Sequence, residues 1–404
     1  MGDSALSSPN FRKYYVGSIF SLLGIWIQRL AIGWQAWELS ESAFIVGLVA
    51  SVAFLPVVVL TPFFGVIADR VQTRSAMIFL NSIMLAIAAL LGVVTIAGAM
   101  TVEVLVSISL LQGIVVSAYT PARLAMMPLL VPQSLFPSAV ALMGIVFNLS
   151  RFVGPGLAGI VVALYGIGWA YVINAISYLP VLLALSLVEV SAEHHEPKKK
   201  RPYFQQLTEG LRYARDHLPI RQAILIAGTC SLLGRGSLEI MPALAALIFD
   251  GGSTELAVLM SSAGIGAIAG SFAFSTRFLQ VRMQSLILGA SFFVAIALAL
   301  FGLVRNFYAG VAAVMMLGLA QTLVSVGSQA FVQVEVENEL RGRVMSLWTL
   351  FSMGGASIGA LIAGALARGW DASHTLLAFA GACVVLALLA GAHKPGARHE
   401  ATSS

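Results

Sequence analysis

The stretch GVIADRVQTR, residues 65–74, places one acid and two arginines between two long apolar runs, at about 44–68 and 75–97. Each run is long enough to cross a bilayer as a helix, which takes about 20 apolar residues. Membrane β-strands are excluded, because they are segments of about 10 residues with alternating polarity. The stretch therefore predicts a short charged loop that joins two membrane-spanning helices.

The same pattern recurs along all 404 residues, of which 59% are hydrophobic and 10% are charged. Soluble domains carry about 25% charged residues, so this composition excludes a soluble enzyme with one anchor, a disordered chain and a secreted disulfide scaffold. The other predicted spans lie at about 16–38, 102–122, 138–165, 168–189, 222–248, 256–279, 284–304, 307–330, 343–367 and 372–392. The sequence therefore predicts an all-α polytopic membrane protein with twelve transmembrane helices.

The basic residues of the loops indicate how these spans are oriented. If twelve spans alternate, nearly all loop lysines and arginines fall on one side, and only Arg305 and Arg368 fall on the other. Cytoplasmic loops carry this excess of positive charge, so we expect both termini in the cytoplasm of a bacterial cell and the chain in its cytoplasmic (inner) membrane. The net charge is +5, but the basic residues sit in short loops between the apolar runs and form no continuous surface, which argues against a nucleic-acid partner.

One long polar connection divides the chain into two halves. We predict a six-helix bundle over residues 1–190, a cytoplasmic linker over 191–221, and a second six-helix bundle with a cytoplasmic tail over 222–404. The glycine-rich stretches at 154–159 and 359–364 recur in the fifth span of each half. Such duplication is typical of transporters whose substrate site lies at the membrane midplane between the repeats. The KKKR run within the linker either binds anionic lipid headgroups or serves only as a topology determinant.

Four charged residues lie well inside predicted spans, namely Arg29, Arg151, Arg235 and Glu239. Because a charge at the bilayer centre costs about 2.5–3.5 kcal/mol, these residues indicate a function. The three arginines predict a positively charged cavity for an anionic, carboxylate-bearing or catecholate-bearing substrate, since guanidinium donors suit such groups. The alternative is structural: Arg235 and Glu239 neutralise each other at i, i+4, and Arg151 bonds to carbonyls freed by Pro155.

Further polar and aromatic residues are candidates for the same cavity. Trp26 and Gln28 lie beside Arg29, and Asn148 and Gln321 are polar residues within other predicted spans. The alternative for the amides is hydrogen bonding between helices. Glu239 is the only acid well inside a predicted span, so we predict that it carries the proton if transport is coupled to protons.

The loop motif identifies a family resemblance. Gly65, Asp69, Arg70 and Arg74 match the signature G-x-x-x-D-R-x-x-x-R, and the chain thereby resembles the major facilitator superfamily. The resemblance implies the two-bundle fold and a conformational latch formed by these residues, which holds the outward-open state. The alternative is that these residues are only the positive charge expected of a cytoplasmic loop.

The fifth span carries a second motif of this superfamily. Gly154, Pro155, Gly156 and Gly159 resemble the motif of its antiporters, which implies an exporter, whereas the alternative is a packing kink at the proline. Residues 26–34, 121–123, 148–159 and 341–346 resemble the enterobactin-exporter-like branch, which contains exporters of siderophores, macrolides and other drugs.

Together these features predict a secondary active transporter that exports a small amphipathic or anionic molecule, such as a siderophore-like compound or a drug. Export proceeds by alternating access and proton-coupled antiport; the alternative is a facilitator or importer of an anionic or lipid-like solute with the same fold. The expected partners are the substrate, protons and membrane lipids, and the resemblance implies a monomer.

We do not expect an enzyme. The sequence shows no P-loop and no nucleophile with a neighbouring base, and every histidine lies in a loop or at the end of a predicted span. Cys230 and Cys383 lie far apart in the sequence within apolar runs, which indicates buried small side chains. We therefore predict neither a cofactor nor a metal site.

Overall fold

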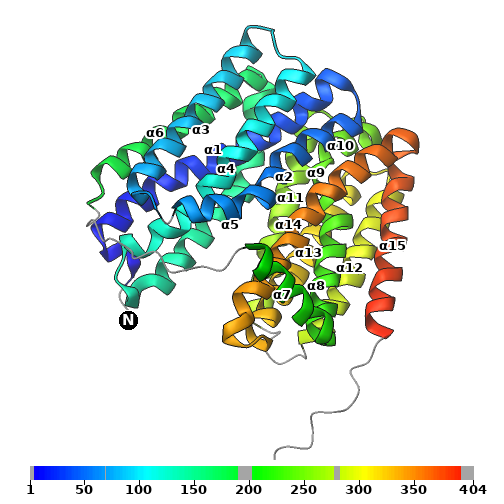
Figure 1. Ribbon diagram of the computed structural model, residues 1–404. Helices are drawn as coiled ribbons and strands as arrows, with labels where there is room; N and C mark the ends of the chain where they lie inside the picture. The colour runs from blue at the N-terminus through cyan, green and yellow to red at the C-terminus, as the bar shows by residue number, and fades with distance from the viewer. Residues whose placement is uncertain (1–3, 69, 190–202, 277–282, 393–404) are drawn as a thin grey trace, which may run out of the picture. The chain divides into compact units, whose positions relative to one another are not determined.

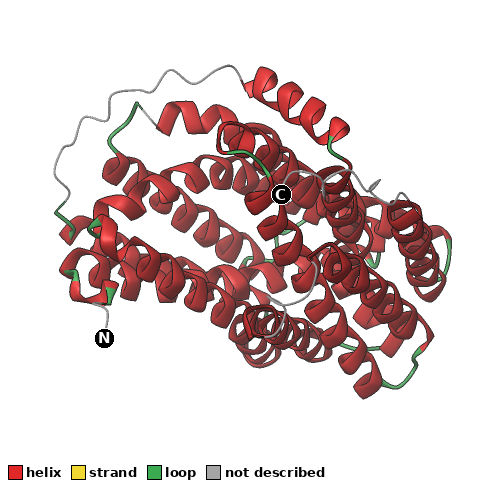
Figure 2. Ribbon diagram, turned by 90° about the horizontal axis from the view of Figure 1, so that it is seen from below, coloured by secondary structure: helices red, strands yellow, loops and turns green. Residues whose placement is uncertain are grey.

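The fold is all-helical, as predicted. The structure, a computed structural model, describes residues 4–68, 70–189, 203–276 and 283–392. Every regular element within these ranges is a helix, and Figure 2 shows no strand among them. Eleven of these helices are long and apolar enough to cross a membrane, and a bent pair supplies the twelfth span. The predicted spans are therefore confirmed, with one break that the sequence did not indicate.

The break lies in the seventh span, which was predicted as one continuous run over 222–248. Here Leu218–Glu239 and Met241–Phe249 meet at an angle of 63°. Two local features account for it. A π-helical turn at Ser231–Arg235 disturbs the hydrogen-bond ladder, and Pro242 stands at the start of the following helix, where its missing N–H is tolerated.

Two compact units make up the chain, and the first comprises Met1–Lys199 and Glu239–Gly264. Its helices are η1 (Ala5–Ser7), α1 (Pro9–Ser40), α2 (Ala43–Ala68), α3 (Thr73–Ile96), α4 (Val102–Leu130), η2 (Gln133–Leu135), α5 (Phe136–Tyr165), α6 (Ile167–Leu187), α10 (Met241–Phe249) and the beginning of α11 (Ser253–Thr276). Helix α1 packs on α5 and α6, α3 packs on α6, and α2 packs on α4 (Figure 1). The predicted bundle over 1–190 thus gains residues 239–264, because α10 packs against α1 and α2 after the bend.

A ladder of buried amides joins three helices of this unit. Gln28 of α1 donates to the side-chain carbonyl of Gln112 on α4 at 3.0 Å, and Asn174 of α6 donates to the carbonyl oxygen of Gln28 at 2.6 Å. Helices α1 and α6 come close because Gly24 has no side chain, since a Cβ there would lie 2.1 Å from the Ser177 hydroxyl. In a membrane such bonds between helices fix their register.

The second unit comprises Lys200–Leu238 and Ile265–Ser404. It contains α7 (Tyr203–Asp216), α8 (Leu218–Cys230), the π-helical turn η3 (Ser231–Arg235), α9 (Gly236–Glu239) as far as Leu238, the remainder of α11, α12 (Met283–Leu303), α13 (Phe307–Glu335), α14 (Asn338–Gly369) and α15 (Ala372–Ala392). Helix α12 packs on α13 and α15, and η3 packs on α14. The last contact is close because Gly236 meets the backbone of Gly359.

Part of the predicted linker is a helix. Helix α7 packs on α14, where Glu209 forms an ion pair with Arg343 at 2.5 Å and Gly210 abuts the Arg343 carbonyl. Leu211 and Arg212 of α7 are exposed. The KKKR run lies outside the described residues. A helix forms here because α14 supplies a surface for one face of α7, which the sequence of the linker does not reveal.

Candidate functional site

An ion pair inside the first unit joins two of the predicted site residues. The Nη2 atom of Arg29 lies 2.6 Å from both carboxylate oxygens of Glu239. The side chain of Glu239 is 10% exposed and that of Arg29 is 30% exposed. The two residues meet because α1 and α10 touch where a Cβ at Gly33 would lie 2.9 Å from Pro242. Glu239 thus has a partner 210 positions away in the sequence.

Aromatic rings surround the same arginine. The guanidinium carbon of Arg29 lies 5.2 Å from the ring centre of Trp26 and 4.7 Å from that of Phe54. The guanidinium carbon of Arg151, on α5, lies 5.9 Å from the Trp26 ring centre. Each such contact contributes about 0.5–2 kcal/mol, more where water is excluded. Two arginines from different helices therefore lie over one indole ring.

We call Trp26, Arg29, Phe54, Arg151 and Glu239 the Arg29 cluster. Two guanidinium groups and one carboxylate give it a formal charge of +1. The indole N–H of Trp26 is buried and has no hydrogen-bond partner among the described atoms. The cluster thus combines flat apolar faces, guanidinium donors and one buried N–H donor, which is the chemistry that an aromatic or anionic ligand requires.

The glycine motif of α5 positions Trp26. A Cβ at Gly154 would lie 2.4 Å from the Cβ of Trp26, and a Cβ at Gly159 would lie 2.4 Å from that of Ala257. Gly156 faces the Ser261 hydroxyl, and Pro155 is buried. The motif therefore brings α5 against α1 and the start of α11. Its role in antiport stays a prediction.

The predicted amide ligands make other contacts. Gln28 is 3% exposed and belongs to the amide ladder. Asn148 donates to the carbonyl of Gly144 in its own helix at 3.0 Å, and Gln321 donates to the carbonyl of Cys230 at 2.6 Å in the second unit. The contacts of Gln28 and Gln321 join different helices, as the alternative expects, whereas that of Asn148 stays within α5. A role of these amides toward substrate stays a prediction.

Arg235 lies at the end of the π-helical turn and is half-buried in the second unit. The turn departs from the α-helical spacing of backbone hydrogen bonds, and such π-helical turns are frequent at functional sites. Its predicted role in substrate binding is untested by this geometry.

Residues of the predicted latch lie around the loop between α2 and α3. Arg74 donates from Nε to the carbonyl of Leu185 at 2.8 Å and from Nη2 to that of Ser186 at 2.5 Å, which closes the carboxyl end of α6. Arg70 is exposed, and a Cβ at Gly65 would meet no atom within 4 Å. Asp69 lies outside the described residues. Arg74 therefore has a structural contact within the first unit, and the latch itself stays a prediction.

The sequence profile of the transmembrane secretion effector family matches residues 3–402. The chain belongs to this family of major facilitator transporters. The predicted resemblance is confirmed, and the chain is a multi-pass membrane transporter rather than an enzyme.

Several curated relatives are similar over most of their length. The staphyloferrin A transporter of Staphylococcus aureus is 26% identical over 83% of this chain and 84% of the relative. Macrolide efflux protein A of Streptococcus pyogenes is 23% identical over 83% and 84%, respectively. The enterobactin exporter of Citrobacter koseri is 23% identical over 89% and 85%.

Solved structures confirm the fold. A variant of the nucleoside transporter NupG superposes with a TM-score of 0.76 at 15% identity, over 95% of this chain and 99% of that one. A bacterial homologue of the human lysosomal transporter Spinster gives a TM-score of 0.73 at 14% identity, over 97% and 96%. At these identities the likeness establishes the major facilitator fold alone.

Proposed function

We propose that this transporter exports a small amphipathic molecule from the cytoplasm by alternating access. The molecule carries a flat apolar face and an anionic oxygen beside a hydroxyl group, as in a catecholate or a hydroxycarboxylate. The Arg29 cluster is the observation that carries the proposal. In this arrangement both chain termini face the cytoplasm of a bacterial cell.

The relatives support export of a siderophore-like compound or a drug. Their names include a staphyloferrin A transporter, enterobactin exporters and a macrolide efflux protein. The glycine motif, which packs α5 on the Trp26 side of α1, supports an antiporter.

Recognition follows from the groups in the cluster. The flat face of the substrate stacks on Trp26, while its anionic oxygen accepts hydrogen bonds from Arg29 and Arg151. Charge-assisted bonds to a guanidinium are about twice as strong as neutral ones. The substrate oxygen then takes the place that Glu239 now holds on Arg29.

Glu239 provides a means of proton coupling. Once displaced from Arg29, its carboxylate accepts a hydrogen bond from the substrate hydroxyl. A proton on Glu239 replaces this charged acceptor by the weaker carbonyl oxygen of a neutral carboxylic acid, so the proton and the substrate compete for one residue. Such competition is what exchange in opposite directions requires.

The direction of the pH effect tests this coupling. If the substrate needed Arg29 alone, a proton on Glu239 would release Arg29 and would strengthen binding of the anion. The proposal predicts the reverse, namely weaker binding at low pH when Glu239 carries a proton. If substrate bound more strongly at low pH, and if this pH dependence of binding were lost in Glu239→Gln, antiport through Glu239 would be refuted.

Transport is measured with purified protein in inside-out vesicles, using radiolabelled catecholates and hydroxycarboxylates. Loss of charged hydrogen bonds worth about 1.5–3 kcal/mol should reduce affinity in Arg29→Gln by about 10-fold to 150-fold. Arg12→Gln is the matched control, because Arg12 is an exposed arginine of the same helix. Equal transport by both variants would refute the role of Arg29, and uptake only by right-side-out vesicles would indicate an importer.

A further inference from the structure

Two cysteines that are distant in the sequence meet in the second unit. Cys230 ends α8 and Cys383 lies within α15, 153 positions further on, yet their sulfur atoms are 4.0 Å apart. Both residues are free thiols and both are buried. The sequence indicates two separate buried side chains, whereas the structure forms a dithiol pair.

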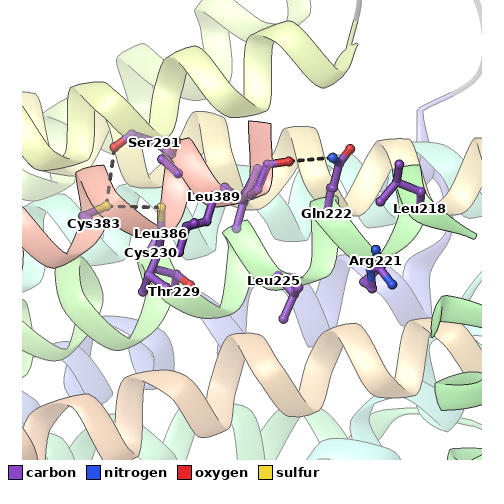
Figure 3. Close-up of a pocket in the computed structure, with 13 residues that line it drawn as sticks. Leu218, Arg221, Gln222, Leu225, Thr229, Cys230, Ser291, Cys383, Leu386 and Leu389 are labelled. Atoms are coloured by element: carbon purple, nitrogen blue, oxygen red, sulfur yellow. Dashed lines mark hydrogen bonds between the residues drawn. The ribbon is translucent and has the colours of Figure 1, made fainter. Parts of the chain in front are cut away.

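The pair lies at a cavity of about 230 Å³ between α8, α12 and α15. Figure 3 shows Cys230, Cys383 and Ser291 together at one end and Leu218 with Arg221 at the other. Most of the lining is aliphatic, and the lining residues Leu225, Leu386 and Leu389 are exposed at the protein surface. A small solute can therefore approach the thiols through an apolar opening.

The sulfur–sulfur distance indicates what fits between them. A disulfide bond is about 2.05 Å long, so the sulfurs would have to approach by about 2 Å to form one. A metal ion with metal–sulfur bonds of about 2.3 Å holds two sulfurs about 3.8 Å apart at a tetrahedral angle and about 4.6 Å apart in a linear arrangement. The observed 4.0 Å lies nearer the tetrahedral value, and a linear arrangement requires the two sulfurs to separate by about 0.6 Å.

We propose that Cys230 and Cys383 form a binding site for a soft, thiophilic divalent cation of low coordination number. Each thiol releases one proton when it binds the metal. Two thiolates and a divalent ion give a neutral complex, which suits an apolar cavity better than a charged one. The carbonyl of Ser291 accepts a hydrogen bond from Cys383 at 3.6 Å and orients that thiol.

The number of donors sets the selectivity. In the part of the chain that the structure describes, no group of three or more His, Cys, Asp or Glu side chains is arranged to hold a metal ion. Zn²⁺ prefers four ligands in protein sites, whereas Hg²⁺ is satisfied by two thiolates. The pair should therefore discriminate between these two ions.

Metal bound to Cys230 would restrain the π-helical turn that follows this residue. Cys230 immediately precedes Ser231–Arg235, and its carbonyl accepts the hydrogen bond from Gln321. A bridge to Cys383 would tie the start of this turn to α15. We expect transport to slow when the site is occupied.

The test uses the reduced full-length protein in detergent, titrated separately with HgCl₂ and ZnCl₂. We expect one Hg²⁺ per chain, an ultraviolet thiolate-to-metal band, and loss of both free thiols, with no such band from Zn²⁺. Retention of Hg²⁺ against excess 2-mercaptoethanol would show that both sulfurs hold it, because a monothiol displaces an ion bound at one sulfur more easily. Cys230→Ser and Cys383→Ser should each lose this retention.

Thr229→Ala is the matched control, since Thr229 lines the same cavity and the variant keeps both thiols. The competition on the unmodified protein keeps the test informative if a cysteine variant fails to fold. Equally easy removal of Hg²⁺ from the unmodified protein and from the single-cysteine variants would overturn the proposal. Equal binding of Zn²⁺ would also overturn it, because it would require ligands beyond the pair.

Discussion

Replacement of Gly154 by alanine should separate α5 from α1. The added Cβ would lie 2.4 Å from the Cβ of Trp26, whereas non-bonded carbon atoms prefer about 3.5–4.0 Å. Because a Cβ is fixed to the backbone, the two helices must move apart by more than about 1 Å. Overpacking of this kind costs about 1–3 kcal/mol.

Alanine also has the better helix propensity, by about 0.9 kcal/mol. The net effect of Gly154→Ala on the free energy of unfolding should therefore be a loss of about 0–2 kcal/mol. Gly144→Ala is the matched control on the same helix, because a Cβ there meets no atom within 4 Å. The control should show only the gain in propensity, so the two variants should differ by about 1–3 kcal/mol.

Both variants can be compared by reversible unfolding in mixed detergent micelles, followed by circular dichroism. Substrate affinity should fall in Gly154→Ala as well, since Trp26 moves with the helix, and should stay unchanged in Gly144→Ala. Equal unfolding free energies for the two variants would show that α5 does not contact α1 at Gly154.

Three further predictions concern residues near the ends of the helices. Arg74→Ala should lower the unfolding free energy by about 1–3 kcal/mol through the lost bonds to α6, whereas the exposed Arg70→Ala should change it little; equal effects in thermal unfolding would contradict this. Arg343→Gln removes the ion pair with Glu209 and should expose α7 to faster amide hydrogen exchange; unchanged exchange would mean that the pair does not hold α7. Burial, followed by the charge of the nearby Glu337, raises the pKa of Tyr213. The neutral Tyr213 side chain therefore contributes fully to the stability of the folded chain below about pH 10, and this contribution is lost as the pH rises through the raised pKa. The protection factor of α7, which corrects for the base-catalysed rise in intrinsic exchange, should therefore fall as the pH rises through this pKa, and Tyr213→Phe should abolish the fall.

The fold could be predicted from the sequence because its evidence is local. Long apolar runs indicate the membrane-spanning helices, and the lysines and arginines of the loops predict how these helices are oriented. The break between Glu239 and Met241 could not be predicted, since the apolar composition continues across it. Helix α7 was missed for another reason, because its packing surface is supplied by α14.

The candidate site was only partly predictable. Arg29, Arg151 and Glu239 stood out because charges are costly in a membrane, but spacing pointed to Arg235 as the neighbour of Glu239. The pair with Arg29 depends on the contact between α1 and α10. Phe54 gave no signal at all, being one apolar residue in an apolar run.

The amide ladder has a consequence for biosynthesis. Gln28 belongs to the first span to be made, and Asn174 follows it by 146 residues. At about 5–20 residues per second, this partner is synthesised about 7–30 s later. During that interval the first span holds a polar group that lipid cannot satisfy. We therefore expect α1 to stay beside the insertion machinery until α4 and α6 arrive, so that the timing of translation governs when the first span can leave.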